Sequence, residues 1–191
     1  MFGKAAHSGG NFEKGISAIG ELAHKIVAMH KLTDLMRGVT VNVGTVSGGQ
    51  SVNTTAPHAE GQIDLRYVKP QDRAPMLGKL QEIVDTATVL GTSAKLEIRG
   101  EFLPLAGTPA SEELFATYRS AAADAGLDIT GEFSGGCADS GFTAGVGCPT
   151  LCAVGPVGGN AHTAEEYLEV DSMVPRAQAL ALAILRLEPT A

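Results

Sequence analysis

The sequence predicts a mixed α/β chain with two domains, 1–107 and 108–191. In both halves, short stretches of strand-like alternation stand between stretches with the 3.6-residue period of helices. Residues 1–107 contain eleven Lys and Arg against ten Asp and Glu, whereas residues 108–191 contain three Arg, no Lys and eleven Asp and Glu. This change in charge coincides with the stretch 104–109, whose two prolines and one glycine are typical of a linker.

The first domain begins with a predicted helix, for which Asn11 is the candidate N-cap. Its apolar residues recur at the helical period and predict a buried face that comprises Ile16, Ile19, Ala23, Ile26 and Val27. Apolar residues at 39, 41 and 43, and again at 63, 65 and 67, alternate with polar residues. This alternation predicts two half-buried strands, with a turn at 47–50 between them.

A second helix and a third strand complete the first domain. Gly91 ends the helix, which is predicted from the apolar residues Leu77, Leu80, Ile83, Val84 and Ala87. Leu96 and Ile98 mark the strand. The predicted order is helix, strand, strand, helix, strand. One more strand, before Gly3, would complete a ferredoxin-like βαββαβ unit.

The second domain is predicted as an αβαβα segment of an α/β sandwich. Ser111 caps its first helix, which is buried through Leu114, Phe115, Tyr118 and Ala122. Strands at 129–133 and 149–154 follow, with a glycine loop at 134–139 between them. The loop 155–163 then leads to a final helix capped by Asp171. Two strands are too few for a stable sheet.

The net charge of −7 and the aromatic content of 5% exclude several classes of function. An acidic surface repels phosphate groups, so we expect neither a nucleic acid nor an anionic membrane as partner. The longest apolar stretch, 177–185, is too short to span a bilayer, and the first residues contain no apolar signal core. Three cysteines make no disulfide framework and suit a reducing compartment, which predicts a cytoplasmic location.

Two of the five histidines lie in glycine-rich loops. His162 follows a predicted buried strand, at the sheet edge where ligands bind in α/β folds, and its imidazole is a candidate zinc ligand. A solvated loop histidine is an equally good interpretation of its position. His7 precedes the first helix and is a candidate donor to a substrate oxyanion or carboxylate; composition alone favours an exposed loop residue.

Three further side chains are candidates for chemistry. Arg66 lies on a predicted strand and has the geometry to clamp a carboxylate with two parallel hydrogen bonds, with Asn53 as its companion on the preceding loop. Without further information, a surface ion pair and an Asx turn are the better interpretations of these two residues. Cys137 is a candidate nucleophile with His162 as its base, although most cysteines are inert.

Four stretches, in this order along the chain, together resemble the M20 metallopeptidase family. Residues 3–9 match the G-K-x-x-H-x-G opening of that family's dimerisation (lid) domain. Residues 53–66 match its N-x-x-P-x-x-A-x-x-x-x-D-x-R stretch, except that Ala56 replaces the usual proline. Residues 135–140 are similar to its G-G-x-x-D segment, and residues 155–167 to its G-x-G-x-x-H-x-x-x-E-[YF] motif. The glutamate carboxypeptidase branch is the most similar.

The resemblance implies a pair of zinc ions in the intact enzyme, with His162 as the last metal ligand. Such a pair activates a bridging water and polarises the scissile carbonyl. The family's other metal ligands and its catalytic glutamate precede the lid motif, and this sequence does not contain them. Because one ligand cannot hold catalytic zinc, we expect little or no zinc on this chain and no activity of the chain alone.

The resemblance also implies roles for the other candidates. His7 reaches into the active site of the partner subunit of a homodimer, where it stabilises the tetrahedral oxyanion. Asn53 and Arg66 hold the C-terminal carboxylate of the substrate, while Gly135 and Gly136 line the site. The implied dimer forms through the lid domain, by pairing of an open sheet edge.

The sequence therefore predicts part of a zinc-dependent carboxypeptidase or amidohydrolase. Its substrate would be a peptide or N-acyl amino acid with a C-terminal, glutamate-like residue. Three alternatives remain: a dimerisation module without activity, an M20 deacylase acting on N-acyl amino acids, and a cysteine hydrolase that uses Cys137 and His162.

Overall fold

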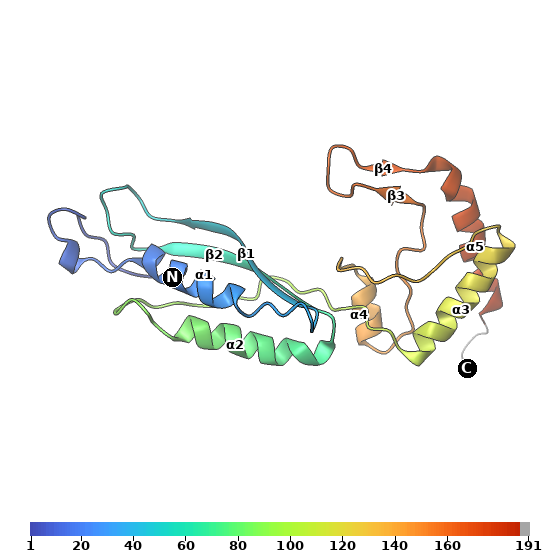
Figure 1. Ribbon diagram of the computed structural model, residues 1–191, viewed down its shortest axis with the longest axis horizontal. Coiled ribbons are helices and arrows are strands. Elements are labelled where there is room, and N and C mark those ends of the chain that lie inside the picture. Colours follow the sequence, from blue (N-terminus) through green and yellow to red (C-terminus); the bar gives the residue numbers. More distant parts are fainter. Residues whose placement is uncertain (188–191) are drawn as a thin grey trace. The chain divides into compact units, whose positions relative to one another are not determined.

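The computed structural model describes residues 1–187, which form two compact units (Figure 1). The first unit comprises Met1–Glu101, and the second begins at Phe102, a few residues before the predicted boundary at 107. Both units mix helices with small antiparallel sheets, which confirms the predicted fold class. Within residues 1–187, no helix is both long enough and apolar enough to cross a bilayer.

The first unit is built on an antiparallel pair of strands, β1 (Val39–Gly48) and β2 (Ala59–Tyr67). Their register sets Val41 opposite Leu65 and Val39 opposite Tyr67, so the predicted apolar positions share one face. Helices α1 (Ala18–His30) and α2 (Arg73–Asp85) cover that face (Figure 1). The buried core consists of Met29, Val39, Val41, Met76, Leu80 and Val84. β1 continues beyond the predicted strand through a bulge at 43–45.

The first residues of the chain lie between β2 and Ser93. The N-terminal amine donates to the carbonyl of Ala59 at 2.9 Å, and Phe2 and Ser93 exchange two backbone hydrogen bonds of 2.8 and 3.1 Å. This places the segments in the spatial order 93, 1–4, β2, β1, as in the predicted ferredoxin-like unit. The prediction of a strand at 96–98 is wrong, because the N-terminal segment, its neighbour in this order, bonds to Ser93 through Phe2 and makes no backbone hydrogen bond to 96–98.

Helix α1 differs from the prediction in its cap and in its buried face. Asn11 precedes a short 3-10 turn at Phe12–Lys14, and the cap of α1 is Ser17, whose Oγ accepts the N–H of Gly20 at 3.0 Å. Three of the five residues predicted to be buried are exposed: Ala23, Ile19 at 44% and Val27 at 58%. The buried residues are instead Ala18, Glu21, Leu22, Lys25 and Met29.

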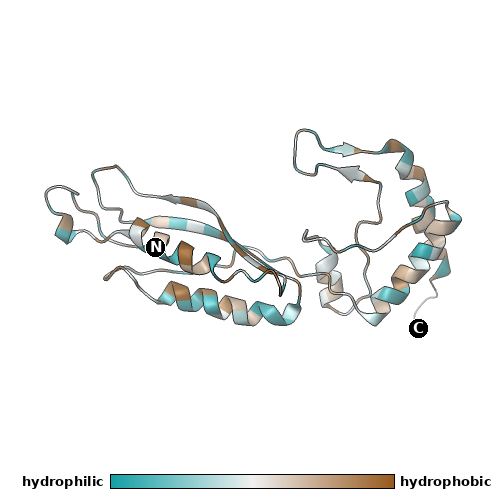
Figure 2. Ribbon diagram, viewed as in Figure 1, coloured by the Kyte–Doolittle hydropathy of each residue, from teal (hydrophilic) through white to brown (hydrophobic). Residues whose placement is uncertain are grey.

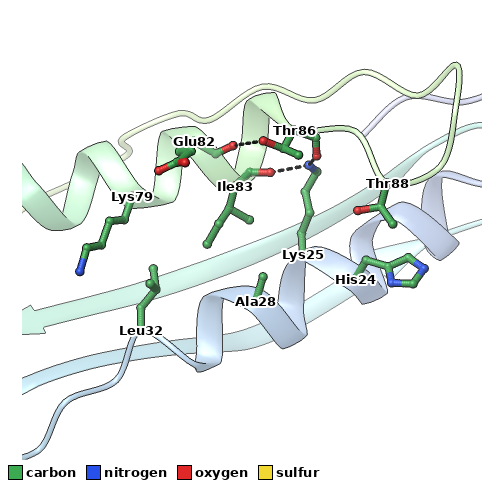
Figure 3. A pocket seen from close by; sticks show the side chains of 9 residues that line it. All are labelled: His24, Lys25, Ala28, Leu32, Lys79, Glu82, Ile83, Thr86 and Thr88. Carbon is green, nitrogen blue, oxygen red and sulfur yellow. Dashed lines mark hydrogen bonds between the residues drawn. The ribbon is translucent and has the colours of Figure 1, made fainter.

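Lys25 joins α1 to the end of α2 from within the protein. Its side chain is 2% exposed, and its Nζ donates to three carbonyl oxygens, those of Ile83 at 2.6 Å, Val84 at 3.0 Å and Thr86 at 2.7 Å. Figure 3 shows Lys25 beside Ile83 and Thr86. The carbonyl groups at a helix C-terminus have no partners within the helix and carry a partial negative charge. The ammonium group therefore caps α2 from a neighbouring helix.

Glu21 binds the segment that follows α2. Its carboxylate lies 2.8 Å from Lys25 Nζ and accepts the N–H groups of Thr88 at 3.0 Å and Val89 at 2.6 Å. Burial on its own raises the pKa of this carboxyl. The hydrogen bonds from Lys25 and Val89 outweigh burial, so that the pKa lies below its ordinary value. The carboxylate is thus held in its charged form inside the protein.

The second unit is organised around two packed helices, α3 (Pro109–Asp124) and α5 (Met173–Arg186). Its apolar core consists of Tyr118, Ala121, Ala122, Ile129, Ala179 and Ala183. Thr108 is the N-cap of α3 and shares a capping box with Ser111, so the predicted cap is displaced by one turn. A short helix α4 (Ser140–Gly145) and a hairpin of β3 (Gly158–Gly159) and β4 (Tyr167–Leu168) complete the unit.

Three further predictions for this unit are wrong. The segments 129–133 and 149–154 form no strands, although Ile129 is buried and Leu151 and Val154 pack against the core. A segment forms a strand only when its backbone is hydrogen-bonded to a neighbouring strand, and neither segment has such a partner among residues 102–187. Asp171 lies in a 3-10 turn, and Ser172 is the residue that precedes α5.

Helix α5 presents apolar side chains to solvent. Figure 2 shows brown and teal positions along it, and Val174 is 65%, Ile184 60% and Leu185 82% exposed. Apolar residues exposed together in this way are typical of a surface that another part of a protein covers.

Candidate functional site

The structure brings His7 and Asn53 together. The segment 6–8 runs beside 53–55: Ser8 N–H donates to the carbonyl of Asn53 at 2.9 Å, and Thr55 N–H donates to the carbonyl of Ala6 at 2.9 Å. The two candidates therefore come from neighbouring backbone segments, although they lie far apart in sequence. This juxtaposition depends on the loop 49–58 folding back after β1.

Both side chains are exposed and oriented by local hydrogen bonds. Nδ1 of His7 accepts the backbone N–H groups of Gly9 and Gly10, each at 3.1 Å. Oδ1 of Asn53 accepts the hydroxyl of Ser51 at 2.7 Å. The Asn53 amide nitrogen and the His7 Nε2 remain the donors that this pair can direct toward a ligand.

Arg66 lies apart from this pair. It stands opposite Thr40 near the end of β2, whereas Asn53 lies six residues before the start of β2 at Ala59. Arg66 lies seven steps along the strand from Ala59, which is about 23 Å at ~3.3 Å per residue. Arg66 Nε donates to Asp64 Oδ2 at 2.7 Å on the polar face of β2, and both side chains are about half exposed. Within one chain, Asn53 and Arg66 are not adjacent.

Gly135 and Gly136 lie in the exposed loop before α4, where Gly136 N–H donates to Ser134 Oγ at 3.1 Å. Cys137, the next residue, is an exposed free thiol. Among the described residues, no hydrogen bond joins Cys137 to His162, so the structure provides no support for the cysteine hydrolase alternative.

His162 lies at the tip of the β3–β4 hairpin, and its backbone has a left-handed φ of 67°. Its backbone N–H donates to Glu166 Oε2 at 3.3 Å. The expectation that it follows a buried strand and precedes a helix is wrong, because β3 and β4 flank it. Nowhere in residues 1–187 do three His, Cys, Asp or Glu side chains gather into a group that could hold a metal ion. The described residues therefore do not fit a complete zinc site, and His162 supplies one ligand at most.

Sequence analysis missed the buried contacts between α1 and α2. A groove of about 330 Å³ lies along these helices, and its polar lining consists of His24, Lys25, Lys79, Glu82, Thr86 and Thr88 (Figure 3). Its most buried charge, Lys25, is fully hydrogen-bonded to the protein. The i, i+4 spacing of Glu21 and Lys25 was the available signal, but such a pair is usually exposed.

Two comparisons of the sequence found similar proteins. Residues 1–92 match the M20 family's peptidase dimerisation domain. The uncharacterised protein YqjE of Bacillus subtilis is 29% identical over 180 residues, which cover 93% of this chain and 47% of that protein.

Among solved structures, the chain is similar to a tripeptidase of Staphylococcus aureus, with a TM-score of 0.79 and 24% identity over 96% of this chain and 48% of the tripeptidase. It is also similar to aminopeptidase PepT of Bacillus cereus, with a TM-score of 0.67 and 24% identity over 96% of this chain and 48% of that enzyme. An aminobenzoyl-glutamate utilization protein of Klebsiella pneumoniae gives a TM-score of 0.62 and 18% identity over 97% of this chain and 46% of that protein.

These similarities establish the fold, and the chain spans about half the length of the proteins it matches. The sequence match covers the first unit apart from its last residues, including the segments that carry His7, Asn53 and Arg66. Residues 1–92 therefore match the dimerisation domain of M20 peptidases, and the chain shares its fold with part of a tripeptidase and of an aminopeptidase.

Proposed function

We propose that this chain is part of a zinc-dependent M20 carboxypeptidase or amidohydrolase that releases a C-terminal, glutamate-like amino acid from a peptide or N-acyl amino acid. The observation that carries the proposal is the juxtaposition of His7 and Asn53 within a peptidase dimerisation domain. Two exposed side chains that carry N–H donors can bind a carbonyl oxygen, a developing oxyanion or a carboxylate.

In this proposal, each candidate residue has a defined role. His7 donates to the oxyanion in the active site of the partner subunit, and Asn53 orients the substrate beside it. Arg66 binds the substrate carboxylate from a different part of the lid, because it does not adjoin Asn53 in its own chain. The loop at Gly135 and Gly136 lines the site.

His162 is the proposed contribution of this chain to the metal site. When bound, zinc supplies an activated water and polarises the scissile carbonyl. Since the described residues contain no complete ligand group, the remaining ligands would come from a further part of the protein.

The proposal is tested by comparing this chain with the gene product that includes any coding sequence upstream of Met1. Release of a C-terminal amino acid is measured with and without added zinc. We expect zinc-dependent release from the longer protein and none from the chain alone. Release by the chain alone, or no release by either protein from peptide and N-acyl substrates, would contradict the proposal.

A second candidate function is a dimerisation module without activity of its own. The observation in its favour is the lack, in residues 1–187, of any group of three potential metal ligands. An inactive longer protein that still self-associates would support it. An M20 deacylase is distinguished within the same assay by its preference for N-acyl amino acids over peptides.

We predict that the chain self-associates at micromolar concentration. The first half of the outer edge of β1 is occupied, because Val39, Val41 and Val43 bond to Asp34, Thr33 and His30. Among the described residues, the stretch 44–48 pairs only with β2, so its outer edge is available to a second copy in an isologous dimer. Light scattering should give a dimer mass, and a monomer at these concentrations would refute the prediction. Thr45→Lys adds one positive charge per copy in the open stretch of β1 and should weaken the dimer several-fold, whereas Gln62→Lys on β2, directly opposite Thr45, should not.

We predict that Arg66→Lys in the intact enzyme lowers kcat/KM about ten- to a hundredfold for substrates with a free C-terminal carboxylate. Lys cannot reproduce the two parallel bonds of a guanidinium, and charge-assisted bonds of this kind contribute ~1.5–3 kcal/mol. Amide-capped substrates should lose little. Equal losses on both substrates would indicate that Arg66 is structural, through its pairing with Asp64.

A further inference from the structure

The loop that follows His7 holds the His7 imidazole. The N–H groups of Gly9 and Gly10 both donate to Nδ1 at 3.1 Å, and Asn11 N–H closes the loop on the carbonyl of His7 at 3.1 Å. A ring nitrogen that accepts hydrogen bonds presents its lone pair and carries no hydrogen. In a neutral imidazole, the single N–H must then be at Nε2.

We propose that Gly9 and Gly10 are positioning residues that fix the tautomer of the neutral His7 imidazole, with the hydrogen on Nε2, so that this nitrogen serves as a hydrogen-bond donor. The identity of the acceptor, a substrate oxyanion, rests on the proposed function. The arrangement excludes two other uses of the same ring. Nδ1 is occupied by the two backbone donors, and a protonated Nε2 has no lone pair with which to bind a metal ion or abstract a proton.

The His7 ring is held by the backbone N–H groups of Gly9 and Gly10, and the lack of a side chain at these two residues is not required. A Cβ added at Gly9 would lie 3.5 Å from Cε1 of His7, and one at Gly10 would lie 3.7 Å from Nδ1, which are ordinary contact distances. Neither residue has a left-handed φ. Alanine at either position therefore keeps the donor without strain, whereas proline removes it.

His30 provides an internal reference with the opposite arrangement. Its Nε2 accepts the N–H of Val43 at 3.2 Å, so that its hydrogen belongs on Nδ1 when the ring is neutral. Two histidines of one protein are thus expected in opposite tautomers, each fixed by a backbone donor.

The test is nitrogen NMR of the full chain labelled with ¹⁵N-histidine, at about pH 8, above the ordinary titration range of histidine. His7 should show a pyridine-type Nδ1 and a pyrrole-type Nε2, and His30 should show the reverse. In Gly10→Pro, the population of the Nδ1–H form of His7 should rise about fivefold, since one hydrogen bond contributes ~1 kcal/mol. Gly10→Ala should leave His7 unchanged, and the His30 pattern in each variant reports whether the first unit is intact.

The wild-type spectrum decides the proposal by itself. An averaged pair of His7 signals, or a hydrogen on Nδ1, overturns it, whatever the variants do. A Gly10→Pro spectrum equal to that of Gly10→Ala, with the His30 pattern intact, overturns the role of the glycine loop.

Activity then separates this proposal from the proposed function. In the intact enzyme, His7→Gln places an amide donor near the position of Nε2, whereas His7→Asn reaches only the position of Nδ1. His7→Gln should therefore retain at least tenfold more kcat than His7→Asn, about the effect of one hydrogen bond to a charged group. If the NMR pattern holds but the two variants are equally active, the positioning is correct and the oxyanion role of His7 is wrong.

Discussion

Lys25→Ala should lower the free energy of unfolding of the first unit by about 3–5 kcal/mol. The substitution removes the three hydrogen bonds from Nζ to the carbonyl groups at the end of α2. It also leaves the buried carboxylate of Glu21 without its cation. An uncompensated buried charge costs far more than the lost volume of the side chain, which is why the effect exceeds that of an ordinary surface substitution.

Native-state hydrogen exchange of the α1 amides is the appropriate measurement, because the two units need not unfold together. Lys95→Ala is the matched control, since Lys95 pairs with Glu97 on the surface and its side chain is 68% exposed. That variant should change stability by less than about 0.5 kcal/mol. Similar losses in the two variants would show that burial of the Lys25 pair is not what stabilises the helices.

The same pair makes the first unit sensitive to acid. Because the pKa of Glu21 lies below its ordinary value in the folded chain, its ionised form stabilises the fold above the unfolded pKa of about 4.3. This contribution falls as the pH drops below that value and is lost as the pH passes through the folded pKa. In Glu21→Gln the slope of stability against pH in this window should be smaller than in the wild type.

His7→Ala in the intact enzyme should lower kcat about 10²–10³-fold with little change in KM. This is the range found when one donor to an oxyanion is removed, because such a donor acts in the transition state and not on the bound substrate. The substitution removes an exposed side chain, so the stability of the first unit should stay within about 0.5 kcal/mol of the wild type.

Mixing two inactive variants tests whether His7 acts across the dimer. His7→Ala lacks the proposed oxyanion donor, and His162→Ala lacks the proposed metal ligand. In a mixed dimer, one active site combines the intact His162 of the first variant with the intact His7 of the second. Random exchange should restore about a quarter of wild-type activity. No recovery after subunit exchange would contradict the proposal that His7 serves the partner's site.

The β1–β2 hairpin was predictable because its signal is local. Each apolar residue at 39–43 and 63–67 alternates with a polar one, and register follows once that face is buried. The buried face of α1 was not predictable, because apolar periodicity does not identify charged residues as buried. The burial of Glu21 and Lys25 depends on backbone groups about 60 residues away. The failure at 129–133 and 149–154 has a related cause: an apolar run becomes a strand only beside another strand.

The candidate site shows the same division between local and distant information. The motif spacing identified His7 and Asn53, and the pairing of 6–8 with 53–55 brings them together. The motif spacing could not show that Arg66 lies far along β2. The thirteen residues from Asn53 to Arg66 are compatible with a tight turn or with an extended strand. The tautomer of His7 depends on the orientation of two backbone amides, about which residue identity carries no information.

The acylation rate of Lys25 provides a measure of how often the first unit opens locally. The other six lysines of the chain are exposed and should react at once with an amine-acylating reagent, whereas Lys25 is 2% exposed with every hydrogen of its ammonium group directed at protein oxygen. Acylation of Lys25 requires α1 to separate from α2. Its rate, followed by mass spectrometry in the native protein, therefore reports how often the helix pair opens.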